Sequence, residues 1–598
     1  MKSVLCNRQG FALVTTLGTL SILMALLSSY YILNMVEIGT SQSSTDSTTG
    51  FYVAEAGLNL RAEEIRQTFL GFNRPTGTSP EENGACSGTN QGSGDFVCKS
   101  YDLAGRTATT YVVEEAGNPQ IITIPPGELY QNLNAQEYRY TAYSVAKNSK
   151  GKTEAILALR FKSRLVPLFQ FAAFYNKDLE ILPGPTMTLA GPVHTNGDLY
   201  LDAGNSLDIL GQVTTAGDLY RGRKNSNTCN GHPVRVIDPV NLRELPSCSG
   251  GRTQIDESAL GPWNGMIQTG VDVVTVPTVD SFDPTPGKLY WDKADLRVVL
   301  KLDAAENALA IEVRNADNSV AVADLPGLGG DCAAAVDTTY ISEDGAANSF
   351  YNNREGKDIR MLEVNLQKLF NCIHNNSLLG AGKGLDDTSE GGLVFYFTVE
   401  GPNSNTINNY GVRLKNGGEL KATTPGAPAI QGLTVVTNQA IYIQGDYNKT
   451  NKKPAAILAD SLNVLSNNWD DSKDTLSVNS RVATETTINA AFLAGTDITG
   501  GVEGSGGQDK GSYNGGLENY PRFHEKWTGV ALHYRGSFVS LGTPQHVNGA
   551  WKYGNPQYKA PIRDWGYDTD FNDASNLPPL SPRFVYLRQE LFVREFDQ

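Results

Sequence analysis

The chain is poor in histidine and lacks the motifs of common enzyme families. Only six of its 598 residues are His, and one of them, His524, precedes Glu525 as in the HExxH zinc motif. Position 528 is Thr, so the second zinc ligand of that motif is absent. No GxSxG nucleophile elbow, no P-loop and no GxGxxG followed by a helix occurs. We therefore predict that the protein is not an enzyme and has no catalytic residue, metal site or cofactor.

Charge is scarce as well, and the balance is negative. Charged residues make up 19% of the chain, and its 49 Lys and Arg residues against 64 Asp and Glu residues give a net charge of −15. A protein that binds a polyanion over its whole body is expected to be basic, so that class is excluded, whereas a local basic patch remains open. The 61 Gly, 28 Pro and 26 Tyr residues favour many short strands joined by turns. The predicted fold class is therefore mainly β.

The cysteines lack the CxxC spacing that is typical of zinc sites. Cys229 and His232 form a CxxH pair, but no second pair of ligands follows at finger-like spacing. Apart from Cys6, the cysteines fall into three local pairs, which are Cys86/Cys98, Cys229/Cys248 and Cys332/Cys372. An even set at short separations predicts three disulfides in an oxidising compartment, although spacing alone leaves the connectivity open.

The N-terminus carries one long apolar segment. Lys2 and Arg8 precede an uncharged run from Phe11 to Val36, and no A-x-A-like cleavage site follows it. About 20 apolar residues are enough to span the hydrocarbon core as a helix, and the two cations keep the N-terminal end cytoplasmic. We therefore expect a single-pass inner-membrane helix, with the bulk of the chain periplasmic or extracellular.

Two motifs in this region resemble those of type IV pilins. Gly10-Phe11 resembles a class III prepilin signal, and the block from Ala54 to Leu58, AEAGL, resembles the one found in PilX-type minor pilins. The resemblance covers about the first 70 residues. It implies a leader at residues 1–10, cleavage after Gly10 by prepilin peptidase with methylation of Phe11, and an assembly helix at 11–70.

The same resemblance implies which residues serve assembly. Major pilins carry Glu at the fifth mature position, where it pairs with the N-terminal amine of a neighbouring subunit. Here that position is Thr15, a departure that favours the tip of the filament or a priming position. Glu55 of the AEAGL block is the second predicted assembly residue. The implied partners are the other pilins of a type IV pilus.

Residues 71–165 are predicted to form a pilin-like β domain. Strand-like segments follow one another here, and the last two are separated by Asn148 to Gly151, a hairpin signal. A long helix packed on such an antiparallel sheet is the pilin arrangement. Beyond this domain, residues 501–598 are expected to form a C-terminal β region that completes the head.

An internal repeat follows. GPVHTNGDLY (191–200) and GQVTTAGDLY (211–220) share seven of ten positions at a spacing of 20 residues. Such a period predicts β-solenoid coils, which we assign to residues 166–220 and 386–500; two similar hairpins are the alternative. Residues 221–385 do not repeat, and we predict there an inserted, disulfide-containing α+β domain with a helix from Ile359 to Asn376.

One basic, aromatic-flanked loop stands out in this acidic chain. Tyr220, Arg221, Arg223, Lys224 and Arg235 are candidates for DNA binding, because cations meet phosphates while a Tyr ring stacks on a base. A solvated surface loop is the alternative.

An acidic run lies near the C-terminus. The segment from Asp568 to Asp573, DTDFND, groups oxygen ligands as calcium sites do, but it lacks the Gly and the distal Glu of an EF-hand. A turn held by Asp side chains is the alternative.

The sequence as a whole favours a minor pilin at the tip of a type IV pilus. It resembles the large competence-associated pilins, which implies a receptor for extracellular DNA in natural transformation. A pilus-tip adhesin, or an assembly-priming subunit that does not bind DNA, is the alternative. Two other classes are a type II secretion pseudopilin and a solenoid enzyme acting on polysaccharide, which needs paired carboxylates along one face. Asp198 and Asp218 repeat, but beside glycines at corners.

Overall fold

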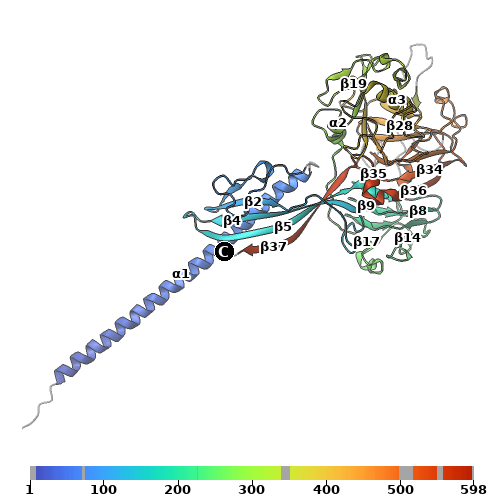
Figure 1. Ribbon diagram of the computed structural model, residues 1–598. Helices are drawn as coiled ribbons and strands as arrows, with labels where there is room; N and C mark the ends of the chain where they lie inside the picture. Colours follow the sequence, from blue (N-terminus) through green and yellow to red (C-terminus); the bar gives the residue numbers. More distant parts are fainter. Residues whose placement is uncertain are drawn as a thin grey trace, which may run out of the picture. The chain divides into compact units, whose positions relative to one another are not determined.

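The computed structural model describes residues 8–70, 74–224, 226–248, 250–338, 350–380, 382–496, 516–547 and 556–595. The chain is mainly β, with one long N-terminal helix (Figure 1). It divides into two compact units. Unit 1 comprises Met1–Gln120, Glu137–Arg164 and Leu587–Gln598, and unit 2 comprises Ile121–Gln136 and Leu165–Tyr586.

The N-terminal helix α1 (Arg8–Leu70) is continuous and has two different halves. Apolar side chains from Phe11 to Ile38 are exposed, whereas Val53, Leu58, Ile65 and Phe69 of the second half are buried against the rest of unit 1. The spacing of these buried residues places them on one face of a helix with 3.6 residues per turn. Phe69 packs against the rings of Tyr138 and Tyr140, at centroid distances of 5.4 and 5.8 Å. The second half of α1 is therefore anchored by ordinary core packing.

The middle of α1 is helical although it is rich in poor helix formers. Thr45, Thr48 and Thr49 each donate their hydroxyl to the carbonyl four residues earlier, at 2.9 Å. These bonds satisfy hydroxyls that otherwise compete with the backbone. The loosening that the composition between residues 39 and 50 suggests does not occur.

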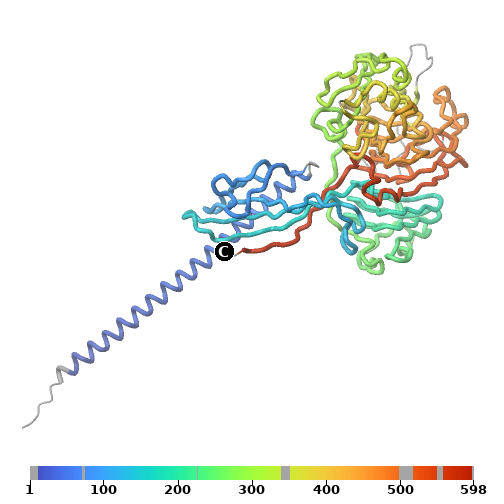
Figure 2. The backbone as a smooth tube through the Cα atoms, in the orientation of Figure 1, coloured from blue at the N-terminus to red at the C-terminus, as the bar shows by residue number. Residues whose placement is uncertain are grey.

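Unit 1 is completed by an antiparallel sheet, in the order β1-β2-β4-β5-β37, with β3 beside β4. The strands are β1 (Lys99–Leu103), β2 (Arg106–Glu114), β3 (Gln120–Thr123), β4 (Asn134–Lys147), β5 (Thr153–Pro167) and β37 (Arg583–Glu595). Helix α1 packs against β2, and this combination of a long N-terminal helix and an antiparallel sheet is a pilin-like fold. Figure 2 shows the C-terminal strand, in red, running beside the strands from the first third of the chain.

The first stretch of unit 2 winds into regular coils, which we call the coil stack (residues 173–237). Each coil adds one short strand to each of three parallel sheets. The first sheet holds β6 (Ala173–Tyr175), β9 (Val193–Thr195) and β12 (Val213–Thr215). The second holds β7 (Leu179–Ile181), β10 (Leu199–Leu201) and β13 (Leu219–Arg221), and the third holds β8 (Met187–Leu189), β11 (Leu207–Ile209) and β14 (Val234–Ile237). The pairing of Leu199 with both Leu179 and Leu219 reproduces the 20-residue period of the repeat.

The rest of unit 2 continues one of these sheets. Strand β35 (Phe538–Ser540) pairs in parallel with β6, so that the coil stack and the later strands share a twelve-stranded sheet. The later strands on this sheet are β32 (Ala491–Ala494), β29 (Ala455–Ala459), β27 (Leu433–Val436), β25 (Leu393–Glu400) and β18 (Leu296–Leu302). A second sheet holds β24 (Arg360–Asn365), β26 (Tyr410–Lys415), β28 (Ala440–Gln444), β30 (Ser461–Leu465) and β33 (Arg522–Phe523).

The predicted insertion at 221–385 is not a separate sheet domain, because most of its described strands join sheets that extend beyond it, and only β22 (Tyr351–Asn352) and β23 (Lys357–Asp358) pair solely with each other. Its strand β18 pairs in parallel with β25, and its strand β24 pairs with β26, both from beyond the predicted boundary. The predicted helix is also shorter, because residues 360–365 form β24 and α3 spans Leu366–Asn376. Met361, Leu362 and Val364 are fully buried between two neighbouring strands, which a strand allows and an amphipathic helix does not. Asn365 caps α3 by accepting the backbone N–H of Lys368.

The C-terminal region does not form one block. Strands β33, β34 (Ala531–Gly536) and β36 (Ile562–Tyr567) belong to unit 2, whereas β37 joins the sheet of unit 1 through β5. The predicted region 501–598 is therefore split between the two units, and its residues 501–515 lie outside the described residues.

Candidate functional sites

The exposed half of α1 is the first candidate site. It is long and apolar enough to cross a membrane, with a mean hydropathy of 2.0 and none of the apolar window buried. Phe11 is 75% exposed, and Gly10 lies within the helix. Most of the predicted leader, residues 1–7, lies outside the described residues. An apolar helical surface of this length, attached to a folded unit, is suited to a bilayer or to helix packing.

Thr15 stands at the position where the resemblance to major pilins would place a glutamate. Its hydroxyl donates to the carbonyl of Phe11 at 2.9 Å and lies 3.0 Å from that of Ala12. The side chain is therefore satisfied by its own helix and needs no partner from another chain, unlike an ionised carboxylate in the same apolar segment.

The AEAGL block lies where α1 meets the sheet. Its Gly57 faces β2 so closely that a Cβ there would lie 2.7 Å from the Cβ of Ala108 and 3.0 Å from the Oγ of Ser144. Glycine at this position is required by close packing of helix on sheet. Glu55 is half-buried, and among the described residues the structure gives its carboxylate no ion pair.

A polar cluster that sequence reasoning missed ties α1 to the first disulfide. Arg61 is 1% exposed and donates to Glu64 at 2.8 Å and to the carbonyls of Asp95 and Val97 at 2.6 and 3.0 Å. Glu64 also accepts bonds from Lys99 and Tyr101, at 2.8 and 2.9 Å. Partial burial acts to raise the pKa of Glu64, but the bonds from Lys99, Arg61 and Tyr101 outweigh it and lower that pKa below its ordinary value. Arg61 thereby fastens the loop before β1 to the helix.

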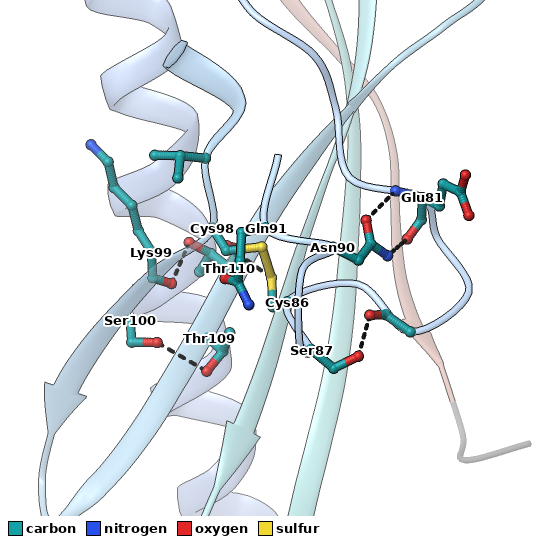
Figure 3. The surroundings of a disulfide bond; sticks show 12 residues. Glu81, Cys86, Ser87, Asn90, Gln91, Cys98, Lys99, Ser100, Thr109 and Thr110 are labelled. Atoms are coloured by element: carbon teal, nitrogen blue, oxygen red, sulfur yellow. Dashed lines mark hydrogen bonds between the residues drawn. A yellow bond between two sulfur atoms is a disulfide. The ribbon is translucent and has the colours of Figure 1, made fainter. Parts of the chain in front are cut away.

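The loop that Arg61 holds is closed by a disulfide. Cys86 and Cys98 are bonded in the predicted pairing, beside the main chain of Thr110 (Figure 3). The amide of Asn90 bridges the two sides of the loop, since it donates to the carbonyl of Glu81 and accepts that residue's N–H, both at 2.8 Å. The loop is therefore closed by a covalent bond and by hydrogen bonds to its main chain.

The basic loop of unit 2 is the second candidate site, and the structure removes Arg221 from it. The Arg221 side chain is 1% exposed, and its guanidinium donates to the carbonyls of His232, Leu245 and Pro246 at 2.9, 3.3 and 3.0 Å. Burial lowers the pKa of Arg221. This arginine holds the segment between Cys229 and Cys248 together and does not face solvent.

Two further candidate cations are paired within the protein. Lys224 lies 3.2 Å from the carboxylate of Asp178 and donates its backbone N–H to Glu180 at 2.6 Å. Arg235 forms a two-pronged pair with Asp208, at 2.7 and 2.8 Å. These pairs cancel much of the positive charge that the sequence suggests. Among the predicted cations in the described part of the loop, Arg223 has an exposed side chain that forms no ion pair.

Tyr220 belongs to a stacked group that includes a residue missed by sequence reasoning. Its ring stacks on Tyr200 from the neighbouring coil, with centroids 4.9 Å apart and an interplanar angle of 10°. The exposed Arg252 lies over both rings, with its Cζ 5.5 Å from each centroid. Arg252 also donates to the carbonyls of Arg223 and Lys224, at 3.3 and 2.6 Å. The Asp-Leu-Tyr repeat signalled the ring stack, but no local signal linked it to Arg252.

The other two disulfides also form in the predicted pairing. Cys229 and Cys248 close the chain around the carbonyls that Arg221 binds, with a Cα–Cα distance of 6.4 Å. Cys332 and Cys372 are fully buried. Their disulfide joins the chain just before β21 (Val336–Thr338) to helix α3.

The acidic run near the C-terminus is held by a lysine. Lys452 lies 2.8 Å from both Asp568 and Asp570, and Asp568 accepts the backbone N–H of Asp570. Among the described residues, no group of three or more His, Cys, Asp or Glu side chains could hold a metal ion. An ion pair and a turn account for the Asp568–Asp573 segment.

The repeated aspartates of the coil stack lie at the corners of the coils and accept backbone N–H groups there. The carboxylate of Asp178 accepts the N–H of Asp198 at 2.8 Å, and that of Asp198 accepts the N–H of Asp218 at 2.9 Å. Each aspartate therefore supports the next coil, and this ladder gives the repeated aspartates a structural role.

Comparison with known proteins gives a distant structural match. No protein-family model matches the chain, and no curated protein matches it. The chain is similar to the crystal structure of competence-associated pilin ComZ from Thermus thermophilus, with 14% sequence identity. The match covers 91% of this chain and 98% of that one, with a TM-score of 0.27. At that score it carries no argument about this chain's site, and the fold is read from the elements described above.

Proposed function

We propose that the protein is a minor pilin of a type IV pilus. The observation that carries this proposal is the single helix α1, whose apolar first half is exposed and whose second half is buried under the unit 1 sheet. Such a helix serves as a membrane anchor before assembly and packs against the helices of neighbouring pilins afterwards. In this role unit 2 is the extracellular part that meets a ligand, and the protein acts by binding and not by catalysis.

Processing of the N-terminus is the first step of this proposal. Prepilin peptidase cuts after Gly10 and methylates the new amine of Phe11, and the helix then passes from the inner membrane into the filament. Mass spectrometry of the mature protein tests this step. A methylated Phe11 supports it, and an intact Met1 on the whole cellular pool contradicts it.

The position in the filament follows from Thr15. A subunit without a carboxylate at this position needs no amine partner, and we propose that it caps the tip. Immunogold labelling of unit 2 on sheared pili is expected at one end of each filament. Label spread along the shaft contradicts the tip position.

We further propose that unit 2 contacts extracellular DNA through Arg223, Arg252 and Tyr220. Two exposed guanidinium groups beside a stacked ring suit phosphates and bases. In a gel-shift assay with the full chain in detergent, Arg223→Ala combined with Arg252→Ala should weaken binding roughly tenfold and flatten its salt dependence. The matched control is Arg235→Gln combined with Arg243→Gln, which removes two arginines that already pair with Asp208 and Asp238. Equal loss in both variants contradicts this site.

A pilus-tip adhesin is the second candidate. The ion pairs of Lys224 and Arg235 favour it, because they leave little net positive charge for a polyanion. Absence of DNA binding by the full chain at low salt, together with loss of surface attachment when the gene is deleted, would select this role.

A further inference from the structure

The hairpin between β4 and β5 carries three lysines in an acidic chain. Lys147, Lys150 and Lys152 are all exposed, and the structure records no ion pair for them. Elsewhere many exposed lysines do have carboxylate partners, as Lys449 has Asp446 at 2.9 Å. The hairpin is therefore a local positive patch on unit 1.

The turn that presents these lysines is well ordered by its own bonds. The amide oxygen of Asn148 accepts the N–H groups of Lys150 and Lys152, at 3.0 and 3.1 Å. The N–H of Asn148 donates to the carbonyl of Lys152, and that of Gly151 to the carbonyl of Asn148, at 3.0 and 2.8 Å. Gly151 has a φ of +78°, which glycine adopts without strain. The three cations thus share one fixed platform.

The strand register places this platform at the end of unit 1 nearest the apolar segment. Lys147 pairs with Thr107 of β2. Arg106, which precedes Thr107 in the chain, donates to Asp46 of α1 at 3.0 Å. Arg106 also pairs with Glu154 at the start of β5. Lys147 therefore lies level with Asp46, and the turn beyond it extends toward the N-terminal half of α1, as Figure 1 shows for the β4–β5 end of the sheet.

The distance from this platform to a bilayer is short. The dense run of exposed apolar side chains in the first half of α1 ends at Ile38, and beyond it Tyr52 and Leu60 are exposed singly. At 1.5 Å per residue, Asp46 lies about 12 Å further along the helix. The headgroup layer adds roughly 5 to 8 Å on each side of the hydrocarbon core. A lysine side chain spans most of the remaining gap, because its flexible stem carries the charge well away from the backbone.

We propose that the β4–β5 hairpin is a docking surface for anionic phospholipid headgroups, which holds unit 1 upright on the membrane before assembly. The inference rests on the membrane step of the proposed function, since α1 must span the bilayer to bring the hairpin near it. Arg106 pairs with both Asp46 and Glu154, and Asp102, which accepts the hydroxyl of Thr107 at 2.9 Å, keeps its negative charge. These three carboxylates face four cations, which are Arg106 and the three hairpin lysines.

Amine labelling of the full chain in lipid nanodiscs tests this proposal. Discs of phosphatidylcholine are compared with discs that also contain phosphatidylglycerol, and mass spectrometry measures acetylation at each lysine. Labelling of Lys147, Lys150 and Lys152 should fall at least about threefold in the anionic discs and recover at high salt. Exposed unit 2 lysines with ion pairs serve as internal controls and should be labelled equally in both discs; these are Lys421, Lys449 and Lys473.

Each other outcome overturns the proposal. Equal labelling of the hairpin in both discs, with the chain co-eluting with the discs, rejects the docking surface while leaving the anchor intact. Failure to co-elute with either disc rejects the membrane step of the proposed function and this inference with it. If double-stranded DNA added to phosphatidylcholine discs protects the hairpin lysines from acetylation to the same degree, the patch is assigned to nucleic acid. If inorganic phosphate alone protects them, it is assigned to a free anion.

Discussion

Gly57 of α1 and Ala108 of β2 approach so closely that a methyl group on residue 57 would lie 2.7 Å from the Ala108 Cβ. The helix backbone at Gly57 of the AEAGL block therefore lies directly on small side chains of the sheet. This contact sets how closely α1 packs against the sheet. It also fixes which part of the helix the other strands of unit 1 lie beside.

Gly57→Val should destabilise unit 1. The added side chain must displace Ala108 or Ser144, and overpacking of this kind costs about 1–3 kcal/mol. Chemical unfolding of the full chain in detergent, followed by hydrogen exchange in β2, measures the loss. Gly39→Ala is the control, since no atom lies within 4 Å of its Cβ position, and it should stabilise the helix by about 0.5–1 kcal/mol. Equal effects of the two substitutions would contradict the close packing.

Arg61→Met should loosen the disulfide loop from α1. It removes the donor that the carbonyls of Asp95 and Val97 share, which costs about 1–3 kcal/mol. Arg66→Met is the matched control, because Arg66 makes an exposed pair with Glu63 that contributes about half a kcal/mol or less. Proteolysis between residues 76 and 98 should quicken in the first variant alone.

Arg221→Ala should lower the stability of unit 2 and not merely a binding constant. Its buried guanidinium donates to three carbonyl groups, so its loss costs about 2–4 kcal/mol, whereas Arg223→Ala changes stability by less than about 0.5 kcal/mol. Thermal unfolding monitored on unit 2 distinguishes the two. A binding defect in Arg221→Ala at unchanged melting temperature would show that the side chain is available to ligand after all.

Glu518 should make unit 2 less stable as the pH rises toward neutrality. Burial, followed by the carboxylate of Glu180, raises the pKa of Glu518 from 4.5 to about 7. Between these values the folded chain binds a proton that the unfolded chain has lost, so this contribution is complete below pH 4.5 and is lost as the pH rises through about 7. Its size is of the order of 3 kcal/mol.

The test of this prediction is a difference measurement. Denaturant unfolding of the full chain at both ends of this pH window is compared between the parent and Glu518→Gln. The variant should lose part of the pH dependence and be relatively more stable at neutral pH. The exposed Glu257→Gln serves as the control, and identical pH profiles for parent and Glu518→Gln would contradict the assignment.

The features that the sequence predicts well are those with a local signal. The apolar run of α1, the three disulfides between neighbouring cysteines and the pilin-like strands of unit 1 each depend on residues close together in the chain. The repeat from Gly191 to Tyr220 is equally local, because each coil meets the next at a spacing of 20 residues. Patterning and composition are sufficient in these cases.

The basic loop shows where local signals fail. Five basic or aromatic residues looked equivalent in the sequence. In the structure, Arg221 is buried, Lys224 and Arg235 pair with Asp178 and Asp208, and Tyr220 stacks beneath Arg252. Whether a cation faces solvent depends on which carboxylates and carbonyls the fold brings beside it. That information lies in contacts between distant segments and has no periodic trace in the sequence.

By itself, the sequence determined that this protein has one apolar N-terminal helix, a mainly β body and a 20-residue repeat, and it predicted three disulfides whose connectivity the structure supplied. Only the tertiary structure decided that β37 returns to the sheet of unit 1, that residues 360–365 are a strand and not a helix, and that Lys147 of the β4–β5 hairpin lies near the Arg106–Asp46 pair. The physical reason is the range of the interactions. Helix and turn preferences act over a few residues, whereas strand pairing and burial are set by whichever distant segments supply the neighbouring edge.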